Sequence, residues 1–178
     1  FGHQFGANHT FNGLGESCTD AISLTNAYEI GSGTTIMSYN GICNADQNIP
    51  SGDVLDNYFH IKSLEEMYDY VTFGEGNTCG NPVTSPNIAP SVDANPCNAT
   101  YTIPKGTPFY LKAEGQWTDT DTHSYCWEQI DEDGAGKPTQ GFIGTQAGNS
   151  TITPLFRSFP PSASPERYFP SLETIISG

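Results

Sequence analysis

The chain has 178 residues and a formal net charge of −14, from six Lys and Arg against 20 Asp and Glu. This acidic excess argues against nucleic acid or an anionic membrane surface as a partner, and the absence of any run of 18 apolar residues argues against a membrane span. Five cysteines without a C-x-x-C spacing favour a disulfide-bonded protein of an oxidising compartment over a zinc ribbon. We therefore expect a secreted protein, whose acidic loops could hold hard cations such as calcium.

The first 13 residues predict the end of a helix, followed by a turn. They contain the pattern H-x-x-G-x-x-H at His3, Gly6 and His9. Six residues turn an α-helix through about 600°, so both imidazoles can face one metal only if the helix ends between them. Gly6 is placed where a left-handed residue would end it. Zinc takes imidazole nitrogens as ligands, and two surface histidines beside a glycine are the alternative that this pattern leaves open.

The strongest helix is predicted at residues 53–73. Asp53 is its expected N-cap, and Gly74 follows as a C-terminal stop. His60 lies in this stretch and is expected on the helix surface or as a cap rather than as a metal ligand. One apolar stripe recurs at spacings of three and four, formed by Val54, Tyr58, Ile61, Leu64, Tyr68 and Val71.

A change of composition to Gly, Asn, Pro, Thr and Ser predicts a linker, placed at residues 79–90. Beyond it, β-prone runs alternate with turns, as in an antiparallel β-sandwich. The predicted strands are residues 101–103, 108–113, 124–130 and 172–176, with Trp127 in the core. We expect a mixed, two-domain fold: a mainly α and loop domain at 1–78, and a β-sandwich, incomplete in strand number, at 91–178.

Acidic turns in the second half offer oxygen ligands between the predicted strands. Ordinary turns are the simpler interpretation and calcium binding between strands is the alternative; the residues concerned are Asp119, Asp121, Asp131 and Asp133. His123 follows the first two of these, and we expect it to be exposed in a loop.

His3, Gly6 and His9, followed by Met37 in a β-prone turn at residues 34–39, resemble the metzincin clan of zinc metallopeptidases. The clan's signature is H-E-x-x-H-x-x-G-x-x-H followed by a methionine turn. The chain matches it from Phe1 onward, and the first His and the Glu of the signature would fall immediately before Phe1. Residues 4–9 and the cysteine-bearing loops look most like secreted, reprolysin-like bacterial enzymes.

The resemblance implies that His3 and His9 are the second and third zinc ligands and that Met37 lies under them without binding metal. Tyr39 stands where some branches of the clan have a tyrosine that reaches the zinc or the oxyanion, and an ordinary turn tyrosine is the alternative. The implied reaction is zinc-dependent hydrolysis of peptide bonds in extracellular proteins, with the Glu as general base.

Since the signature Glu is not in the chain, the resemblance implies an active parent protein and an inactive 178-residue fragment. Two imidazoles alone would bind zinc weakly. Apolar side chains left uncovered would be exposed or repacked by self-association, among them Phe5, Phe11 and Tyr58.

The cysteines suggest two bridges. Cys18 and Cys43 flank the Met37 segment, and a bridge between them would brace the loops around the site. Cys97 and Cys126 could join the first strand of the sandwich to the strand that carries Trp127.

The second half resembles the Ig-like or fibronectin-like modules appended to secreted bacterial peptidases, which bind substrate, glycan or a cell surface, or act as spacers. The competing hypothesis for the whole chain is a non-catalytic secreted adhesion or carbohydrate-binding protein with a coincidental zinc motif. The residues upstream of Phe1 in the parent gene separate the two, because His-Glu there favours the enzyme.

Overall fold

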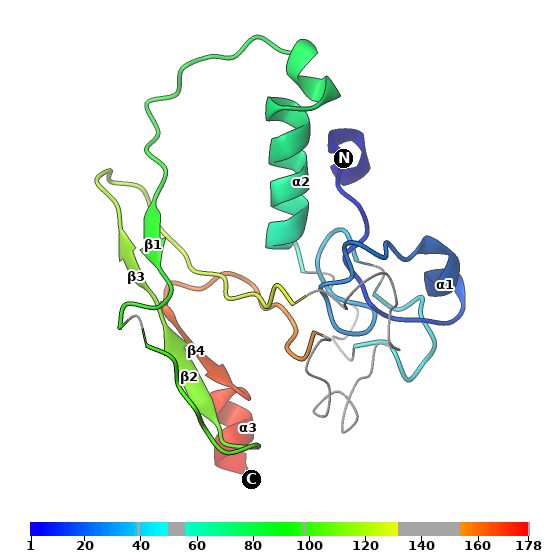
Figure 1. Ribbon diagram of the computed structural model, residues 1–178, viewed down its shortest axis with the longest axis vertical. Helices are drawn as coiled ribbons and strands as arrows, with labels where there is room; N and C mark the ends of the chain where they lie inside the picture. The colour runs from blue at the N-terminus through cyan, green and yellow to red at the C-terminus, as the bar shows by residue number, and fades with distance from the viewer. Residues whose placement is uncertain (39, 50–55, 98, 132–153, 178) are drawn as a thin grey trace. The chain divides into compact units, whose positions relative to one another are not determined.

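The computed structural model describes residues 1–38, 40–49, 56–97, 99–131 and 154–177 (Figure 1). Two compact units divide the chain, Phe1–Asn81 with Glu128–Pro160, and Pro82–Trp127 with Pro161–Gly178. The prediction assigned residues 91–178 to one domain, whereas the described residues 128–131 and 154–160 group with the first unit. The elements, in chain order, are η1 (Gly2–Phe5), α1 (Ser17–Ala21), α2 (Ile61–Thr72), η2 (Glu75–Thr78), β1 (Ser91–Asp93), β2 (Phe109–Lys112), β3 (Glu114–Gln116), β4 (Glu166–Phe169) and α3 (Leu172–Ser177).

The principal helix of the first unit, α2, is shorter than predicted. It begins at Ile61 instead of Asp53, because the His60 side chain accepts a hydrogen bond from the backbone N–H of Lys62 (3.2 Å) and caps the helix there. Residues 56–60 precede it without helical structure, and residues 53–55 lie outside the described part of the chain. The helix ends at Thr72, close to the predicted stop at Gly74. His60 is therefore a cap, as predicted, although it is buried.

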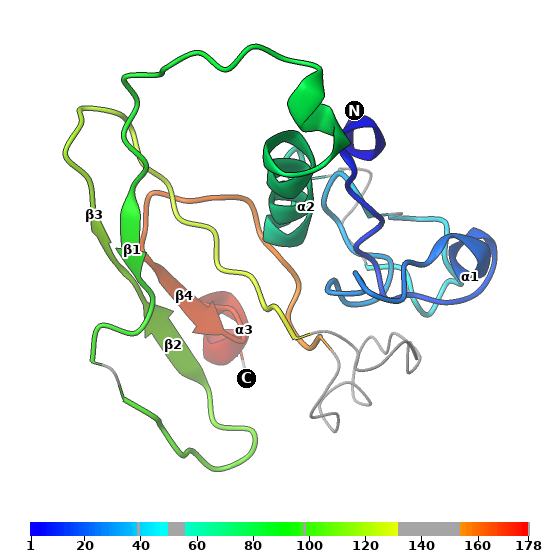
Figure 2. The same ribbon diagram turned by 45° about the horizontal axis from the view of Figure 1, so that its top comes forward.

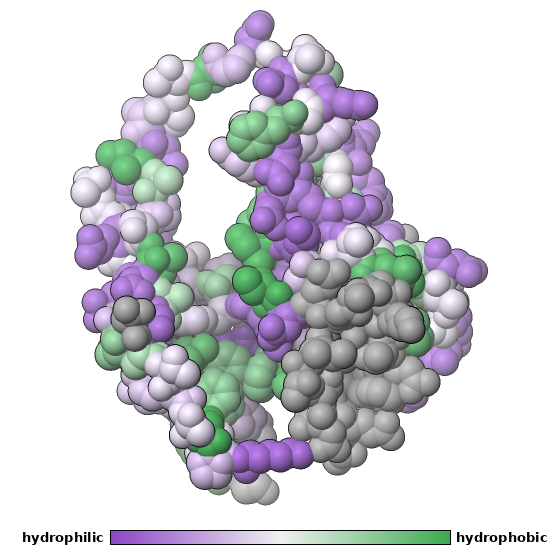
Figure 3. Space-filling model, in the orientation of Figure 1, coloured by the Kyte–Doolittle hydropathy of each residue, from purple (hydrophilic) through white to green (hydrophobic). Residues whose placement is uncertain are grey.

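The predicted apolar stripe of α2 does not face the core of the first unit. Ile61, Leu64, Tyr68 and Val71 are 48%, 47%, 60% and 41% exposed. A different face, which includes Tyr70, packs against η1 and the turn that follows it. Figures 1 and 2 both show η1 beside this helix, and Figure 3 shows hydrophobic patches between the hydrophilic surface that predominates over α2.

Among the described residues, two small apolar clusters form the core of the first unit. Phe11 is fully buried against Cys18 and Cys43, which are joined by a disulfide as predicted. The expectation that Phe11 would be exposed is therefore wrong, because the disulfide and its loops cover the ring, whereas Phe5 is exposed. The second cluster contains Ile30, Ile49 and Leu155.

The Glu128 carboxylate forms hydrogen bonds that connect the part of the chain after Trp127 to the start of α2. We call Glu128–Pro160, which is grouped with the first unit, the returning segment. Glu128 Oε2 accepts a hydrogen bond from the backbone N–H of Ile61 (2.6 Å), and Ser158 Oγ donates to Glu128 Oε1 (2.6 Å). Tyr58 in turn donates its hydroxyl to Ser158 Oγ (2.6 Å), which leaves its ring half-buried. A negative charge at a helix N-terminus is stabilising, so Glu128 explains why the segment after Trp127 joins the first unit.

The second unit contains two small antiparallel sheets, one formed by β1 and β3 and the other by β2 and β4 (Figure 1). The strand predicted at residues 108–113 is confirmed as β2. Phe109 lies opposite Phe169 in the register, with the two rings stacked at 4.9 Å, and Lys112 lies opposite Glu166, with 3.1 Å between Nζ and Oε1. No helix in the described ranges has both the length and the apolar character needed to cross a membrane.

Three of the predicted strands are wrong. Residues 101–103 precede Pro104, whose missing N–H disfavours a ladder, and form none. Within the described residues, 124–130 make only a bridge between Tyr125 and Ser162. Residues 172–176 belong to α3, where Ser171 Oγ accepts a hydrogen bond from the N–H of Thr174 (3.3 Å) and thus favours a helix start.

Candidate metal centre

The turn that brings the two histidines of the motif together has the predicted form. η1 ends at Phe5 and is followed by Gly6, whose φ of 83° is left-handed and whose backbone N–H donates to the C=O of His3 (3.2 Å). The chain then reverses, and the ring centroids of His3 and His9 lie 4.6 Å apart with their planes at 83°. Both imidazoles thus belong to one local cluster.

Each of these imidazoles is oriented by a backbone carbonyl. His3 Nδ1 lies 2.8 Å from the C=O of Ala7, and His9 Nδ1 lies 3.1 Å from the C=O of Met37. A carbonyl oxygen only accepts hydrogen bonds, so Nδ1 carries the proton in both rings. In the neutral rings Nε2 is then the nitrogen with a lone pair for a metal, the arrangement that backbone carbonyls impose on zinc-binding histidines.

Burial favours the neutral form of His9. It lowers the pKa of the imidazole, the hydrogen bond to Met37 opposes this, and the nearby His3 lowers the pKa further. A neutral imidazole is the form that binds metal. The donor pair therefore fits zinc chemically as two ligands. No group of three or more His, Cys, Asp or Glu that could hold a metal occurs among the described residues.

Met37 lies directly beneath η1. Its thioether packs so closely on Gly2 that a Cβ at that position would overlap the sulfur, and the Met37 side chain is buried. The Met37 carbonyl also accepts from the backbone N–H of Thr10 (3.3 Å). Residues 35–38 form turns rather than a strand, and Tyr39 lies outside the described residues.

Helix α2 contacts the turn between the two histidines through Glu66 and Tyr70. Asn8 donates through its backbone N–H to Glu66 Oε2 (2.9 Å) and through its side-chain amide to Glu66 Oε1 (2.7 Å). A Cβ on Gly6 would lie 3.1 Å from Cβ of Tyr70, so the glycine gives room for that ring as well as the left-handed backbone. Neither Glu66 nor Tyr70 was singled out from the sequence.

Glu29 is another residue at this site that sequence reasoning missed. Its buried carboxylate accepts four hydrogen bonds, from the hydroxyls of Thr10 (2.5 Å) and Thr35 (2.6 Å) and from the backbone N–H groups of Thr34 (3.0 Å) and Thr35 (3.1 Å). A signal was present, because residues 1–61 contain no Lys or Arg. An acidic residue within a run of Gly, Ser and Thr must then find neutral donors if it is buried.

The other predicted sites are not assembled. His123 is half-buried instead of exposed, because its ring stacks on Trp117 at 4.2 Å and its Nε2 lies 3.5 Å from Asp119 Oδ1. Asp119 and Asp121 belong to the second unit and Asp131 to the first. Asp133 lies outside the described residues.

The structure does not contain the predicted bridge between Cys97 and Cys126. Both are exposed thiols. Cys97 is hydrogen-bonded to the Tyr101 hydroxyl, which raises the pKa of that phenol. The side chain of Cys97 is thus engaged locally instead of with Cys126.

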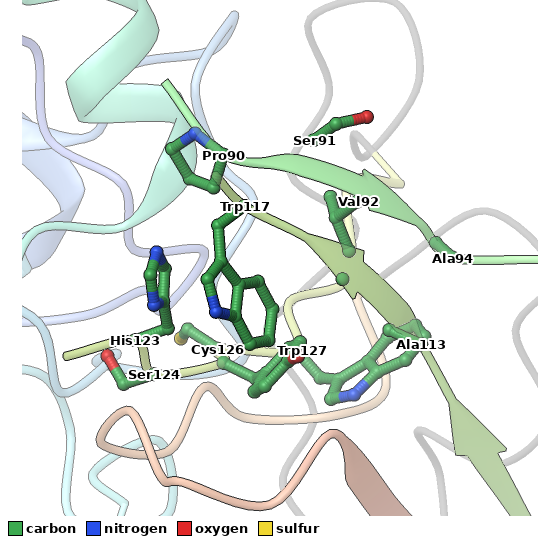
Figure 4. Close-up of a pocket in the computed structure, with 12 residues that line it drawn as sticks. Pro90, Ser91, Val92, Ala94, Ala113, Trp117, His123, Ser124, Cys126 and Trp127 are labelled. Atoms are coloured by element: carbon green, nitrogen blue, oxygen red, sulfur yellow. The ribbon is translucent and has the colours of Figure 1, made fainter. Parts of the chain in front are cut away.

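The second unit also contains a cavity of about 290 Å³, whose lining is rich in aromatic rings. Figure 4 shows the Trp117 indole beside the His123 ring, with Trp127 at the same cavity. Trp127 is half-buried and donates its Nε1–H to the C=O of Pro165 (2.9 Å). Sequence reasoning placed Trp127 in a core and did not predict a cavity.

Comparison with known proteins relates the first unit to a peptidase family. No curated protein and no solved structure matched the chain. Residues 1–60, which include His3, His9, Glu29 and Met37, match the family described as metallo-peptidase family M12B, reprolysin-like. This similarity supports a relationship to the metallopeptidases, a family that depends on zinc in general.

Proposed function

We propose that the protein is a zinc-dependent endopeptidase of the metzincin clan, of the reprolysin-like type. The observation that carries the proposal is the pair of imidazoles at His3 and His9, each with Nδ1–H directed to a carbonyl so that Nε2 is presented to a metal. The match of residues 1–60, which include both histidines, to a metallopeptidase family also supports it.

In this proposal the residues of the chain hold and orient the metal. His3 and His9 supply two ligands, and Met37 packs beneath them in the role of the clan's methionine turn. Tyr39 is proposed to donate a hydrogen bond to the oxyanion. The third imidazole and the general-base Glu are those of the signature, upstream of His3. Zinc, when bound, lowers the pKa of a water molecule and polarises the scissile carbonyl.

We propose further that the protein acts outside the cell on protein substrates. The disulfide between Cys18 and Cys43 supports an oxidising compartment. Residues 1–78 are then the C-terminal subdomain of the catalytic domain, residues 79–90 the linker, and the part of residues 91–178 that belongs to the second unit an accessory module of Ig-like or fibronectin-like type. The antiparallel pairing of β1 with β3 and of β2 with β4 is compatible with such a module.

Casein hydrolysis tests the peptidase proposal. We expect full-length protein that carries His-Glu before Phe1 to hydrolyse casein and to lose this activity with a zinc chelator. The 178-residue chain should show none, because it lacks the general base. Undiminished hydrolysis in the presence of the chelator would rule out a zinc peptidase.

The aromatic cavity of the second unit favours a second function, which is ligand binding. Half-exposed indoles such as Trp117 in a concave, mostly apolar site are typical of binding pockets. Carbohydrate is the ligand class we propose, as in a secreted adhesion protein. Oligosaccharides should quench tryptophan fluorescence in the native chain and quench it less in Trp117→Ala, where only Trp127 remains at the cavity. No quenching in the native chain would exclude binding at this cavity.

A further inference from the structure

We infer that Glu29 is a positioning residue for the metal centre, acting through its carboxylate on the two segments that carry His9 and Met37. This inference rests on the proposed function and deepens it. Glu29 touches neither imidazole: its contacts are with the residues next to His9 and with those leading into the turn at Met37.

On the His9 side, Glu29 holds the chain through both main chain and side chain. Its backbone N–H donates to the C=O of Thr10 (2.8 Å), and its C=O accepts from the N–H of Asn12 (2.9 Å). Oε2 of the carboxylate also accepts a hydrogen bond from the Thr10 hydroxyl. Three hydrogen bonds therefore fix the strand-like segment that leaves His9.

On the Met37 side, the same carboxylate accepts hydrogen bonds from the residues that begin the turn. Oε1 accepts the N–H groups of Thr34 and Thr35, and Oε2 accepts the Thr35 hydroxyl. The C=O of Thr35 accepts from the N–H (3.0 Å) and the hydroxyl (2.7 Å) of Ser38. The turn around Met37 is thus tied to Glu29 at its first residues.

Glycine makes the close approach of this turn feasible. Gly33 has a φ of 62°, and a Cβ there would lie 2.6 Å from Cβ of Ser38 and 3.0 Å from Cδ of Glu29. The two tied segments meet at the Met37 carbonyl, which accepts from the Thr10 N–H and from His9 Nδ1. Glu29 consequently determines where the carbonyl that orients His9 lies.

The polarity of the carboxylate matters, because all four of its partners are donors. In Glu29→Gln one of the two oxygens becomes an NH₂ group. Beside the Thr34 and Thr35 N–H groups it cannot accept, and beside the Thr10 and Thr35 hydroxyls it can only donate, so both hydroxyl protons lose their acceptor. Buried donors are then left unpaired, and the Met37 carbonyl loses its fixed position relative to His9.

The first readout is the tautomer of His9 in the metal-free 178-residue chain, measured by ¹⁵N NMR of the ring. The native chain should show Nδ1–H, whereas folded Glu29→Gln should show a mixture of the two tautomers. Thr35→Val, which removes one hydroxyl and keeps the side-chain size, should also give a mixture of the two His9 tautomers. Thr35→Ser, which keeps the hydroxyl, should show the native tautomer. Asp56→Asn, the same change at a carboxylate that pairs with Arg157, is the matched control and should leave it unchanged.

The second readout is a zinc titration followed by the His3 and His9 ring signals. We expect Glu29→Gln to weaken zinc binding by about 10-fold or more, as for other partners of metal-binding histidines, and Asp56→Asn to leave it unchanged. If zinc shifts neither ring in the native 178-residue chain, which supplies only two imidazoles to the site, the tautomer alone decides the inference and casein hydrolysis by the full-length protein decides the proposed function. If folded Glu29→Gln keeps the native His9 tautomer, the inference is overturned, and if Glu29→Gln does not fold, the Thr35 pair decides in the same way.

Discussion

The lowered pKa of His9, a proposed zinc ligand, makes the stability of the first unit depend on pH. Burial lowers this pKa below the ordinary value of 6.5, so the unfolded chain binds a proton more readily than the folded one. The folded state is then unaffected above about pH 6.5 and loses stability as the pH falls from there through the lowered pKa. In the proposed zinc site, protonation would also compete with the metal for the same ring.

We therefore predict that His9→Gln flattens the dependence of stability on pH. The native chain should lose free energy of unfolding as the pH is lowered from about 7 to about 5, and His9→Gln should lose less. Urea unfolding at a series of pH values measures this. His123→Gln serves as the histidine control, and identical slopes for the native chain and His9→Gln would contradict the assigned burial effect.

Gly6 and Gly41 offer a matched pair for the turn between the histidines. Both have a positive φ, 83° and 88°, but a Cβ would meet the Tyr70 ring at Gly6 and nothing within 4 Å at Gly41. Gly41→Ala should cost about 1–2 kcal/mol for the left-handed backbone alone. Gly6→Ala should cost about 1–3 kcal/mol more because of overpacking, measured as the free energy of unfolding. Equal losses would show that Tyr70 does not constrain the turn.

The loops of the first unit have little regular structure, and their disulfide compensates for this. Cys18 and Cys43 close a loop with a sequence separation of 25 and pack against the buried Phe11. Closing a loop of that length in the unfolded chain is worth about 3 kcal/mol in the chain-entropy description. The bridge therefore constrains the same loops that carry Glu29 and Met37.

Replacing both cysteines with alanine should lower the free energy of unfolding by about 3 kcal/mol. Denaturant unfolding of Cys18→Ala/Cys43→Ala against the native chain measures it. Cys79→Ala, at an exposed thiol, is the control and should change stability little. A double variant as stable as the native chain would show that the bridge adds nothing.

Local features of the site were predictable from the sequence, because they depend on neighbours in the chain. The break at Gly6 follows from the geometry of a helix, and His60 was predicted as a possible cap. The start of α2 was not fully predictable in the same way, since it depends on Glu128, a residue far away in the chain, as well as on the His60 cap. The role of Glu29 likewise depends on donors from two separate segments.

Each of the two units is formed by two separate stretches of the chain. A division into consecutive domains would therefore predict a different result for cleavage of the chain. Residues 80–90 are exposed and have no regular structure. The segment Glu128–Pro160 returns to the first unit, where Glu128 bonds to Ile61 and Arg157 Nη2 lies 3.0 Å from Asp56 Oδ2. Cutting the chain within 80–90 should therefore not release an independent domain.

Limited proteolysis within residues 80–90, followed by gel filtration, tests this arrangement. The two fragments should co-elute without denaturant and separate only when unfolded. Glu128→Ala combined with Arg157→Ala and Tyr58→Phe should let them separate under native conditions, because the polar attachments described above are removed. Separation of the native fragments would favour the simple division at 79–90.

Zinc content of the full-length protein tests the metal centre most directly. We expect about one zinc ion per chain by elemental analysis, with casein hydrolysis that a chelator abolishes. His9→Ala should lose both the zinc and the activity, whereas His123→Ala, a histidine of the second unit, should retain both. A His9→Ala protein that keeps its zinc and its activity would contradict the assignment of His3 and His9 as the ligands.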